Sequence, residues 1–173
     1  TFDTAIAALK ELLEAGYEVL PIMSEISYGT DTRFGKAADF VATLEQLTGH
    51  TVIHTIVDAE PIGPKGLVDL LLIAPCTSNT MAKLATGVNE TCVTMAAKGH
   101  LRNQRRLGLA VSTSDALSGS GKNIGTLLNA KHVYFVPMGQ DNPSGKPRSM
   151  VADFTKILPA VKAAENGVQI QPI

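Results

Sequence analysis

The chain has 173 residues, of which 45% are hydrophobic and 18% are charged, and its formal net charge is −1. This length suits one globular domain with a buried core, and the even charge balance argues against a dedicated nucleic-acid binder, which would carry a basic excess. No apolar run reaches the roughly 18 residues that a membrane span requires. Two cysteines in a chain of this size favour a reducing cytoplasm over a disulfide scaffold.

The first part of the chain predicts helices that alternate with short apolar strands. Residues 3–16 carry apolar side chains at helical spacing and end on a glycine, which predicts an amphipathic helix. The apolar stretch 17–23 predicts a buried strand, residues 36–49 a second helix, and the β-branched run 50–57 a short strand. Because α/β folds usually open on a strand and a turn, we expect a first strand and its glycine-rich phosphate loop upstream of Thr1.

The strongest predicted strand is VDLLLIAP, residues 68–75. Its apolar run does not alternate, so both faces should be buried, as in a parallel sheet. The rest of the chain predicts, in order, helices at 78–87 and 90–101, a strand at 107–112, a loop and helix at 119–131, a strand at 132–139, a polar loop at 140–149 and a helix at 150–165. This alternation predicts an α/β fold with a doubly wound parallel sheet, in a Rossmann or flavodoxin-like three-layer sandwich, and residues 1–173 as a single domain.

Small polar side chains follow several of the predicted strands at their carboxyl ends, where open parallel sheets bind their ligands. Hydroxyls and amides beside helix N-termini suit a phosphate or a polar heterocycle. The alternative is that these side chains only cap the next helix. The candidate binding residues are Ser24, Pro75, Thr77, Ser78, Asn79, Thr80, Ser112 and Thr113.

Other kinds of site have less support in the sequence. His50 and His54 have the spacing of a helical zinc pair, but their run is β-branched and no further ligand completes a set, so we expect no metal site. Cys76 follows a strand, as a nucleophile would, yet no histidine is near it, and buried cysteines usually act as small hydrophobes. No G-x-S-x-G turn supports a Ser–His–Asp triad. A phosphoacceptor receiver domain would need an aspartate where the chain has Ala74 and Pro75.

The segment VDLLLIAPCTSNTMAKLATGVNETCVT resembles the P-x-S-x-N-T region of the homo-oligomeric flavin-containing cysteine decarboxylases, a superfamily of flavoproteins. The resemblance runs essentially end to end, through TRFGKAADF, LTGH, AEPIGPK, MAAKGHLRNQRR, STSDAL, FVPMGQDNP and KPRSMVADF. It implies an FMN site at the strand ends, built partly between protomers of a trimer-based homo-oligomer. By this resemblance, Thr1 matches the helix start after the phosphate turn, and Ser24 matches a residue at the flavin phosphate or ribityl chain. The cradle of the cofactor corresponds to Pro75, Thr77, Ser78, Asn79 and Thr80. The next strand end corresponds to Ser112 and Thr113.

Within this superfamily, the whole pattern resembles a branch from spore-forming bacteria whose members form one half of a two-component oxidoreductase. This resemblance implies oxidation of dihydrodipicolinate to dipicolinate in the mother-cell cytoplasm, with NAD(P) carried by the other component, a separate polypeptide. A dicarboxylate substrate calls for cationic side chains near the site, although any one of them can equally be a solvated loop charge. The loop candidates are Arg33, Lys122, Lys146 and Arg148.

The chain departs from the superfamily where catalytic residues would lie. Decarboxylating members carry a histidine at the place that Pro61 takes here, and a proline cannot exchange a proton. STSDAL replaces both the P-x-M-N loop of the decarboxylases and the Arg-Glu of prenylating relatives. The catalytic residues therefore stay unassigned. A non-catalytic component for structure or substrate delivery, and an FMN-dependent decarboxylase or prenyltransferase, remain alternatives.

Overall fold

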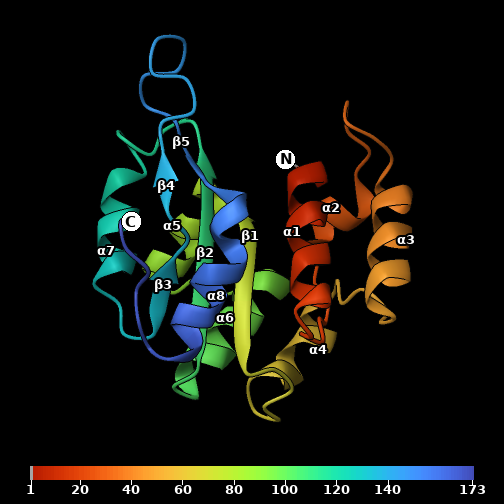
Figure 1. The fold of residues 1–173 in the computed structure, drawn as a ribbon. Helices are drawn as coiled ribbons and strands as arrows, with labels where there is room; N and C mark the ends of the chain where they lie inside the picture. The colour runs from red at the N-terminus through yellow and green to blue at the C-terminus, as the bar shows by residue number, and fades with distance from the viewer. Residues whose placement is uncertain (1) are drawn as a thin grey trace.

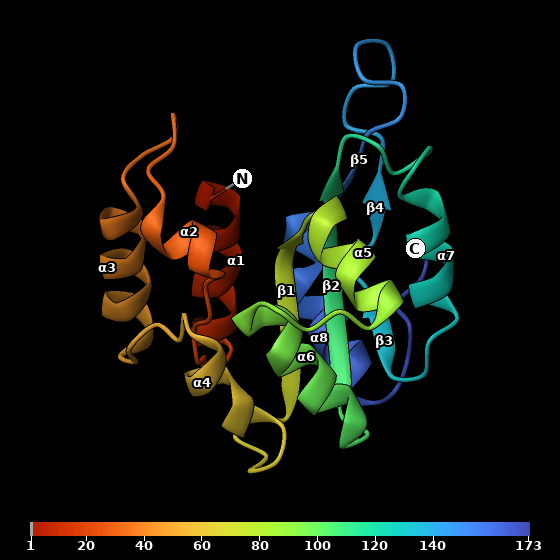
Figure 2. The ribbon, with the colours of Figure 1, turned by 180° about the vertical axis from the view of Figure 1, so that it is seen from behind.

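A central sheet is covered by helices on both faces in the computed structural model, which describes residues 2–173. Helix α8 lies on one face (Figure 1), and helices α5 and α6 lie on the other (Figure 2). The elements in chain order are α1 (Phe2–Glu14), α2 (Glu25–Gly29), α3 (Ala37–Thr48), α4 (Ile56–Ala59), the 3-10 turn η1 (Glu60–Ile62), β1 (Leu70–Cys76), α5 (Ser78–Thr86), α6 (Cys92–Arg102), β2 (Arg106–Thr113), α7 (Gly121–Leu128), β3 (Val133–Phe135), β4 (Met138–Gly139), β5 (Met150–Ala152), the 3-10 turn η2 (Phe154–Lys156) and α8 (Ile157–Glu165).

Strand β2 is the centre of the sheet. Strands β1 and β3 pair with it in parallel, so that Leu107 lies beside both Leu71 and Val133. Strand β5 pairs antiparallel with the last residues of β2, and β4 pairs antiparallel with β5. The layered α/β architecture and its parallel core are therefore confirmed, and the chain adds a short antiparallel extension that the sequence pattern does not predict.

Both faces of β1 pack against apolar side chains, as its unbroken apolar run predicts. Leu71 and Ile73 belong to the core under α5 and α6, while Leu70 and Leu72 pack against the core under α1 and α8. Because side chains alternate along a strand, the seven residues of β1 supply two cores at once. The residue that ends β1, Cys76, is fully buried on the α5–α6 side.

The helices begin and end largely where sequence signals place them. Helices α3 and α5 end on Gly49 and Gly87, both in the left-handed conformation that glycine adopts without steric cost. Helix α6 begins with a capping box between Thr91 and Thr94. The longest helix, α1, has 13 residues, and no helix within residues 2–173 is long and apolar enough to cross a membrane.

Two predicted strands in the first part of the chain are reduced to a single parallel bridge between Ile22 and Ile53. The prediction of full strands at 17–23 and 50–57 is therefore wrong. Residues 56 and 57 instead begin α4, because the Thr55 side chain accepts a hydrogen bond from Asp58 N and caps a helix there.

Two later predictions need correction as well. The predicted strand 132–139 is divided at Pro137, which has no N–H to donate and whose carbonyl accepts from Asp153 N at 2.8 Å. The predicted helix 150–165 begins only at Ile157. Its first residues form β5 because partners are available on β2 and β4, which is information that the helical pattern does not contain.

Candidate functional site

The carboxyl ends of β1 and β2 emerge side by side at one edge of the sheet. Cys76 pairs with Val111, so Thr77, which follows β1, lies at the level of Ser112 near the end of β2. Helix α5 begins at this edge (Figure 2). The Ala74–Pro75 peptide is cis, and the pairing of β1 with β2 shifts between Ile73 and Cys76. The structure thus brings together the candidate residues from Pro75 to Thr80 with Ser112 and Thr113.

Helix α5 begins without a side-chain cap. Its N-cap residue, Thr77, accepts no hydrogen bond from the first turn, and its hydroxyl instead lies 3.4 Å from Thr80 Oγ1. Thr77 and Asn79 are exposed, and Ser78 is half-buried. By contrast, the side chains of Ser24, Thr55 and Thr91 cap α2, α4 and α6. The capping alternative therefore fails for α5, whose first-turn N–H groups and positive dipole end face outward from the strand edge.

Asp115 organises the loop that follows β2. The buried hydroxyls of Thr113 and Ser120 donate to its Oδ1 atom at 2.5 and 2.8 Å. These two hydrogen bonds lower the pKa of Asp115, because they favour the ionised carboxylate. The sequence pattern did not place Asp115 among the binding residues, although the hydroxyl residues around it offered a signal. The Thr113 hydroxyl is occupied by this carboxylate.

Ser24 occupies a different environment. Its Oγ accepts a hydrogen bond from Ser27 N at 3.2 Å and caps α2, as the capping alternative predicts. The neighbouring Glu25 binds the backbone N–H of Cys92, at the start of α6 rather than α5. Thr1 lies outside the described residues. A contact of Ser24 or Thr1 with a cofactor therefore stays a prediction.

The four candidate cations lie in three separate segments of the chain. The Arg33 guanidinium lies 4.7 Å over the ring of Phe34, between α2 and α3. Lys122 is exposed on α7. Lys146 forms an ion pair with Asp141 at 3.7 Å in the loop between β4 and β5, and Arg148 lies two residues further along that loop.

The cysteines do not have the environment of nucleophiles. Cys76 and Cys92 are free thiols with no solvent exposure, and burial raises the pKa of each to about 12. Since the thiolate is the reactive form, both act as core residues. His50 contacts Glu18 at 3.0 Å, and His54 stacks on Tyr28. Among the described residues, no group of three or more His, Cys, Asp or Glu side chains has an arrangement that fits a metal ion.

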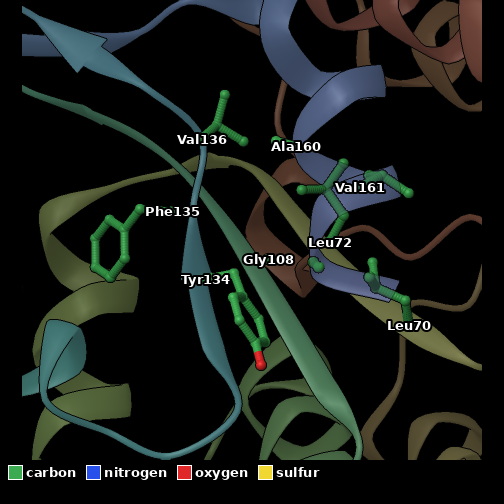
Figure 3. A pocket seen from close by; sticks show the side chains of 9 residues that line it. Leu70, Leu72, Gly108, Tyr134, Phe135, Val136, Ala160 and Val161 are labelled. Atoms are coloured by element: carbon green, nitrogen blue, oxygen red, sulfur yellow. The ribbon is translucent and has the colours of Figure 1, made fainter. Parts of the chain in front are cut away.

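Two hollows lie away from this edge. An apolar cavity of about 10 Å³, at the lower limit for a single water molecule, lies between strands β1, β2 and β3 and helix α8 (Figure 3). Figure 3 shows Leu70 and Leu72 of β1 beside Val161 of α8, while the ring of Phe135 points to the opposite side of the sheet. A wider hollow of about 480 Å³ lies between β4 and residues 170–173. Neither hollow is lined by the hydroxyl residues of the strand ends.

Comparison with known proteins agrees with a flavoprotein fold. The model of the Flavoprotein family matches residues 4–142, so the chain belongs to this family. The chain is 42% identical, over all of its 173 residues and 86% of the relative, to the B subunit of dipicolinate synthase from Bacillus subtilis.

Solved structures support the same assignment. The crystal structure of the dipicolinate synthase B subunit from Bacillus halodurans is 38% identical and matches with a TM-score of 0.87, covering 95% of this chain and 84% of that one. The FMN-dependent cysteine decarboxylase SpaF is 18% identical and matches with a TM-score of 0.66, over 95% of this chain and 91% of that one. This second similarity is one of fold.

Proposed function

We propose that the protein acts as the second subunit of a dipicolinate synthase and contributes to the oxidation of dihydrodipicolinate to dipicolinate during sporulation. The observation that carries this proposal is the 42% identity to a dipicolinate synthase B subunit over the whole of the chain. Its partner in the reaction is the dipicolinate synthase A subunit, which carries NAD(P) as the electron acceptor. The site of action is the cytoplasm, in agreement with two free, buried cysteines.

We further propose that the strand edge binds FMN. The uncapped first turn of α5 offers backbone N–H groups, and the exposed side chains of Thr77 and Asn79 add hydroxyl and amide donors. Ser112 continues this polar surface on the neighbouring strand. These residues fit a polar, anionic cofactor. The occupied Thr113 hydroxyl acts in this arrangement through Asp115 and not as a direct ligand.

When bound, FMN would supply the electron-transfer chemistry of its ring system, and the residues of this chain would supply binding and orientation. The carboxylate of Asp115 in the loop after β2 accepts hydrogen bonds from two hydroxyls, and Pro61 lies in η1 where decarboxylases of the superfamily keep a histidine. The Pro61 observation favours a second candidate function, in which the chain is a non-catalytic protein that supports the A subunit structurally or delivers its substrate. It also argues against an FMN-dependent decarboxylase, and the replacement of the Arg-Glu of prenylating relatives by STSDAL argues against a prenyltransferase.

Flavin binding is tested by the visible absorbance of the purified protein and by titration with FMN. We expect one flavin per chain, and about tenfold weaker binding in Asn79→Ala, because one polar contact at the start of α5 is lost. Thr86→Ala, in the last turn of the same helix, is the matched control and should bind as the wild type does. A protein that neither retains nor binds FMN would contradict the flavin proposal.

Reconstitution with the A subunit separates the two candidate functions. We expect the mixture to form dipicolinate with concomitant reduction of NAD(P), and the rate to fall strongly when this chain is omitted. A rate that depends on this chain but not on FMN would favour the substrate-delivery function. Full dipicolinate synthesis in the absence of this chain would rule out both functions.

We also propose that the protein forms a trimer-based homo-oligomer, as its resemblance to the superfamily implies. Several large apolar side chains are exposed on the described chain, including Ile26, Phe34 and Val57 at 72%, 73% and 80%. Apolar surface that gathers into a patch commonly marks a protein contact, and we expect protomer contacts to bury these side chains. Mass measurement in solution by light scattering tests this proposal, and a monomeric mass would contradict it.

A further inference from the structure

Arg148 is the candidate cation whose main chain is held at the carboxyl end of β2. Its carbonyl accepts a hydrogen bond from Leu117 N at 3.0 Å, and Leu117 belongs to the loop that follows β2. The next residue, Ser149, is only 3% exposed, and Met150 pairs with Thr113 in the antiparallel ladder. The Arg148 side chain therefore projects from a defined point beside the strand end.

The loop that supplies this contact is itself braced by Asp115. The side chain of Asp115 accepts hydrogen bonds from Thr113 and Ser120, which lie on either side of Leu117 in the sequence. Its backbone carbonyl accepts from Ser118 N and Ser120 N at 3.0 and 3.2 Å. These contacts close the segment from Thr113 to Ser120 into one unit, and through Leu117 they also define the position of Arg148.

The charge of Arg148 is uncommitted. Its side chain is exposed, and it forms no ion pair with any carboxylate of residues 2–173. The acidic neighbours along these loops are occupied, since Asp115 accepts from two hydroxyls and Asp141 pairs with Lys146. Arg33, by comparison, lies over the Phe34 ring.

We propose that Arg148 binds a carboxylate of a planar heterocyclic dicarboxylate at this edge, an assignment that rests on the proposed function. The guanidinium group presents two parallel N–H donors that match the two oxygens of a carboxylate, which gives both charge and geometry. The uncapped start of α5 follows β1, which pairs with β2 on the side away from β5. Cofactor and substrate anions are then bound by different elements, α5 for the flavin and the β4–β5 loop for the dicarboxylate.

The test measures binding and not turnover. Dipicolinate is titrated calorimetrically into the protein, with and without its partner subunit, and into the variants Arg148→Ala and Arg148→Lys. We expect Arg148→Ala to weaken binding by about tenfold or more, because a charge-assisted pair of hydrogen bonds is lost. Arg148→Lys should be intermediate, since it keeps the charge but not the paired donors. Arg102→Ala is the matched control, because Arg102 is an exposed arginine that ends α6 and precedes the amino end of β2.

Unchanged thermal unfolding of the variants, measured on the same samples, shows that each is folded. Equal dipicolinate affinity in wild type and Arg148→Ala overturns the assignment and leaves the proposed function standing. An equal loss in Arg102→Ala identifies a general charge effect and also overturns it. If no preparation binds dipicolinate, the assignment is likewise overturned, and the flavin absorbance and reconstituted activity then decide the proposed function independently.

Discussion

His100 is a histidine placed entirely inside the protein, near the end of α6, where its side chain has no solvent exposure. Neither ring nitrogen meets hydrogen-bond geometry with a described group. Burial is the main cause that lowers the pKa of His100, and the charge of Arg105 lowers it further, whereas the nearby backbone of Arg106 and the charge of Asp69 oppose the shift. The folded protein therefore holds this histidine in its neutral form more strongly than the unfolded chain does.

This difference predicts that the protein loses stability in mild acid. Below pH 6.5, the ordinary pKa of histidine, the unfolded chain binds a proton that folded His100 does not, so the free energy of unfolding falls as the pH falls. For one proton the slope is at most about 1.4 kcal/mol per pH unit. Urea unfolding at several pH values measures it. His100→Leu should flatten the profile in this range, and an unchanged slope in that variant would contradict the role given to His100.

At the scale of elements, α6 packs directly on the end of η1 through two glycines. A Cβ atom placed on Gly63 would lie 2.6 Å from Gly99 Cα, whereas a Cβ atom on Gly99 would lie 3.4 Å from Gly63 Cα. The first distance is a clash with backbone and the second an ordinary contact. The two backbones therefore approach as closely as they do because position 63 carries no side chain.

The two glycines give a matched pair of alanine variants. Gly63→Ala should destabilise the protein by about 1–3 kcal/mol, because helix backbone cannot move aside as a flexible side chain can. Gly99→Ala should be neutral or stabilise by up to about 1 kcal/mol, since alanine favours a helix interior and the space is free. Urea unfolding of both variants measures the difference. A Gly63→Ala protein as stable as Gly99→Ala would be inconsistent with the close packing.

At the scale of the whole molecule, helices α1 to α3 lie beyond the edge strand β1, away from β2 (Figure 1). Ala8 and Leu12 of α1 belong to the same core as Val161 of α8. A second connection joins α2 to α6, where Glu25 Oε1 accepts from Cys92 N at 2.9 Å and Met23 O accepts from Cys92 Sγ at 3.0 Å. Two residues from the first part of the chain, Met23 and Glu25, thus contact the first residue of α6.

The Glu25 contact predicts a long-range effect of a surface residue. Glu25→Ala removes a carboxylate from the N-terminal end of α6, so we expect a loss of about 1 kcal/mol in the free energy of unfolding. Amide hydrogen exchange should show faster exchange at Cys92, although the substitution lies in α2. Glu11→Ala, which removes an exposed carboxylate from α1, is the control. Protection of Cys92 that is equal in both variants would refute the connection.

Local patterns were sufficient where one periodicity and one stop signal agreed. The unbroken apolar run from Leu70 to Ile73 predicted a strand buried on both faces, and Gly49 and Gly87 predicted the ends of α3 and α5. The polar residues from Thr77 to Thr80 were correctly placed at a strand end, because a parallel sheet leaves its carboxyl ends at a common edge. Their binding role stays a prediction.

The sequence by itself determined the layered α/β fold, the order of its main helices and strands, and the strand edge at which the hydroxyl residues gather, because these follow from local periodicity and local stop signals. Only the tertiary structure decided which partner each hydroxyl has, since Thr113 donates to Asp115, whereas Thr77 donates to Thr80 and leaves α5 without a side-chain cap. It also decided that residues 150–152 form a strand. A strand needs partners from elsewhere in the chain, and a hydroxyl's availability depends on its neighbours in space.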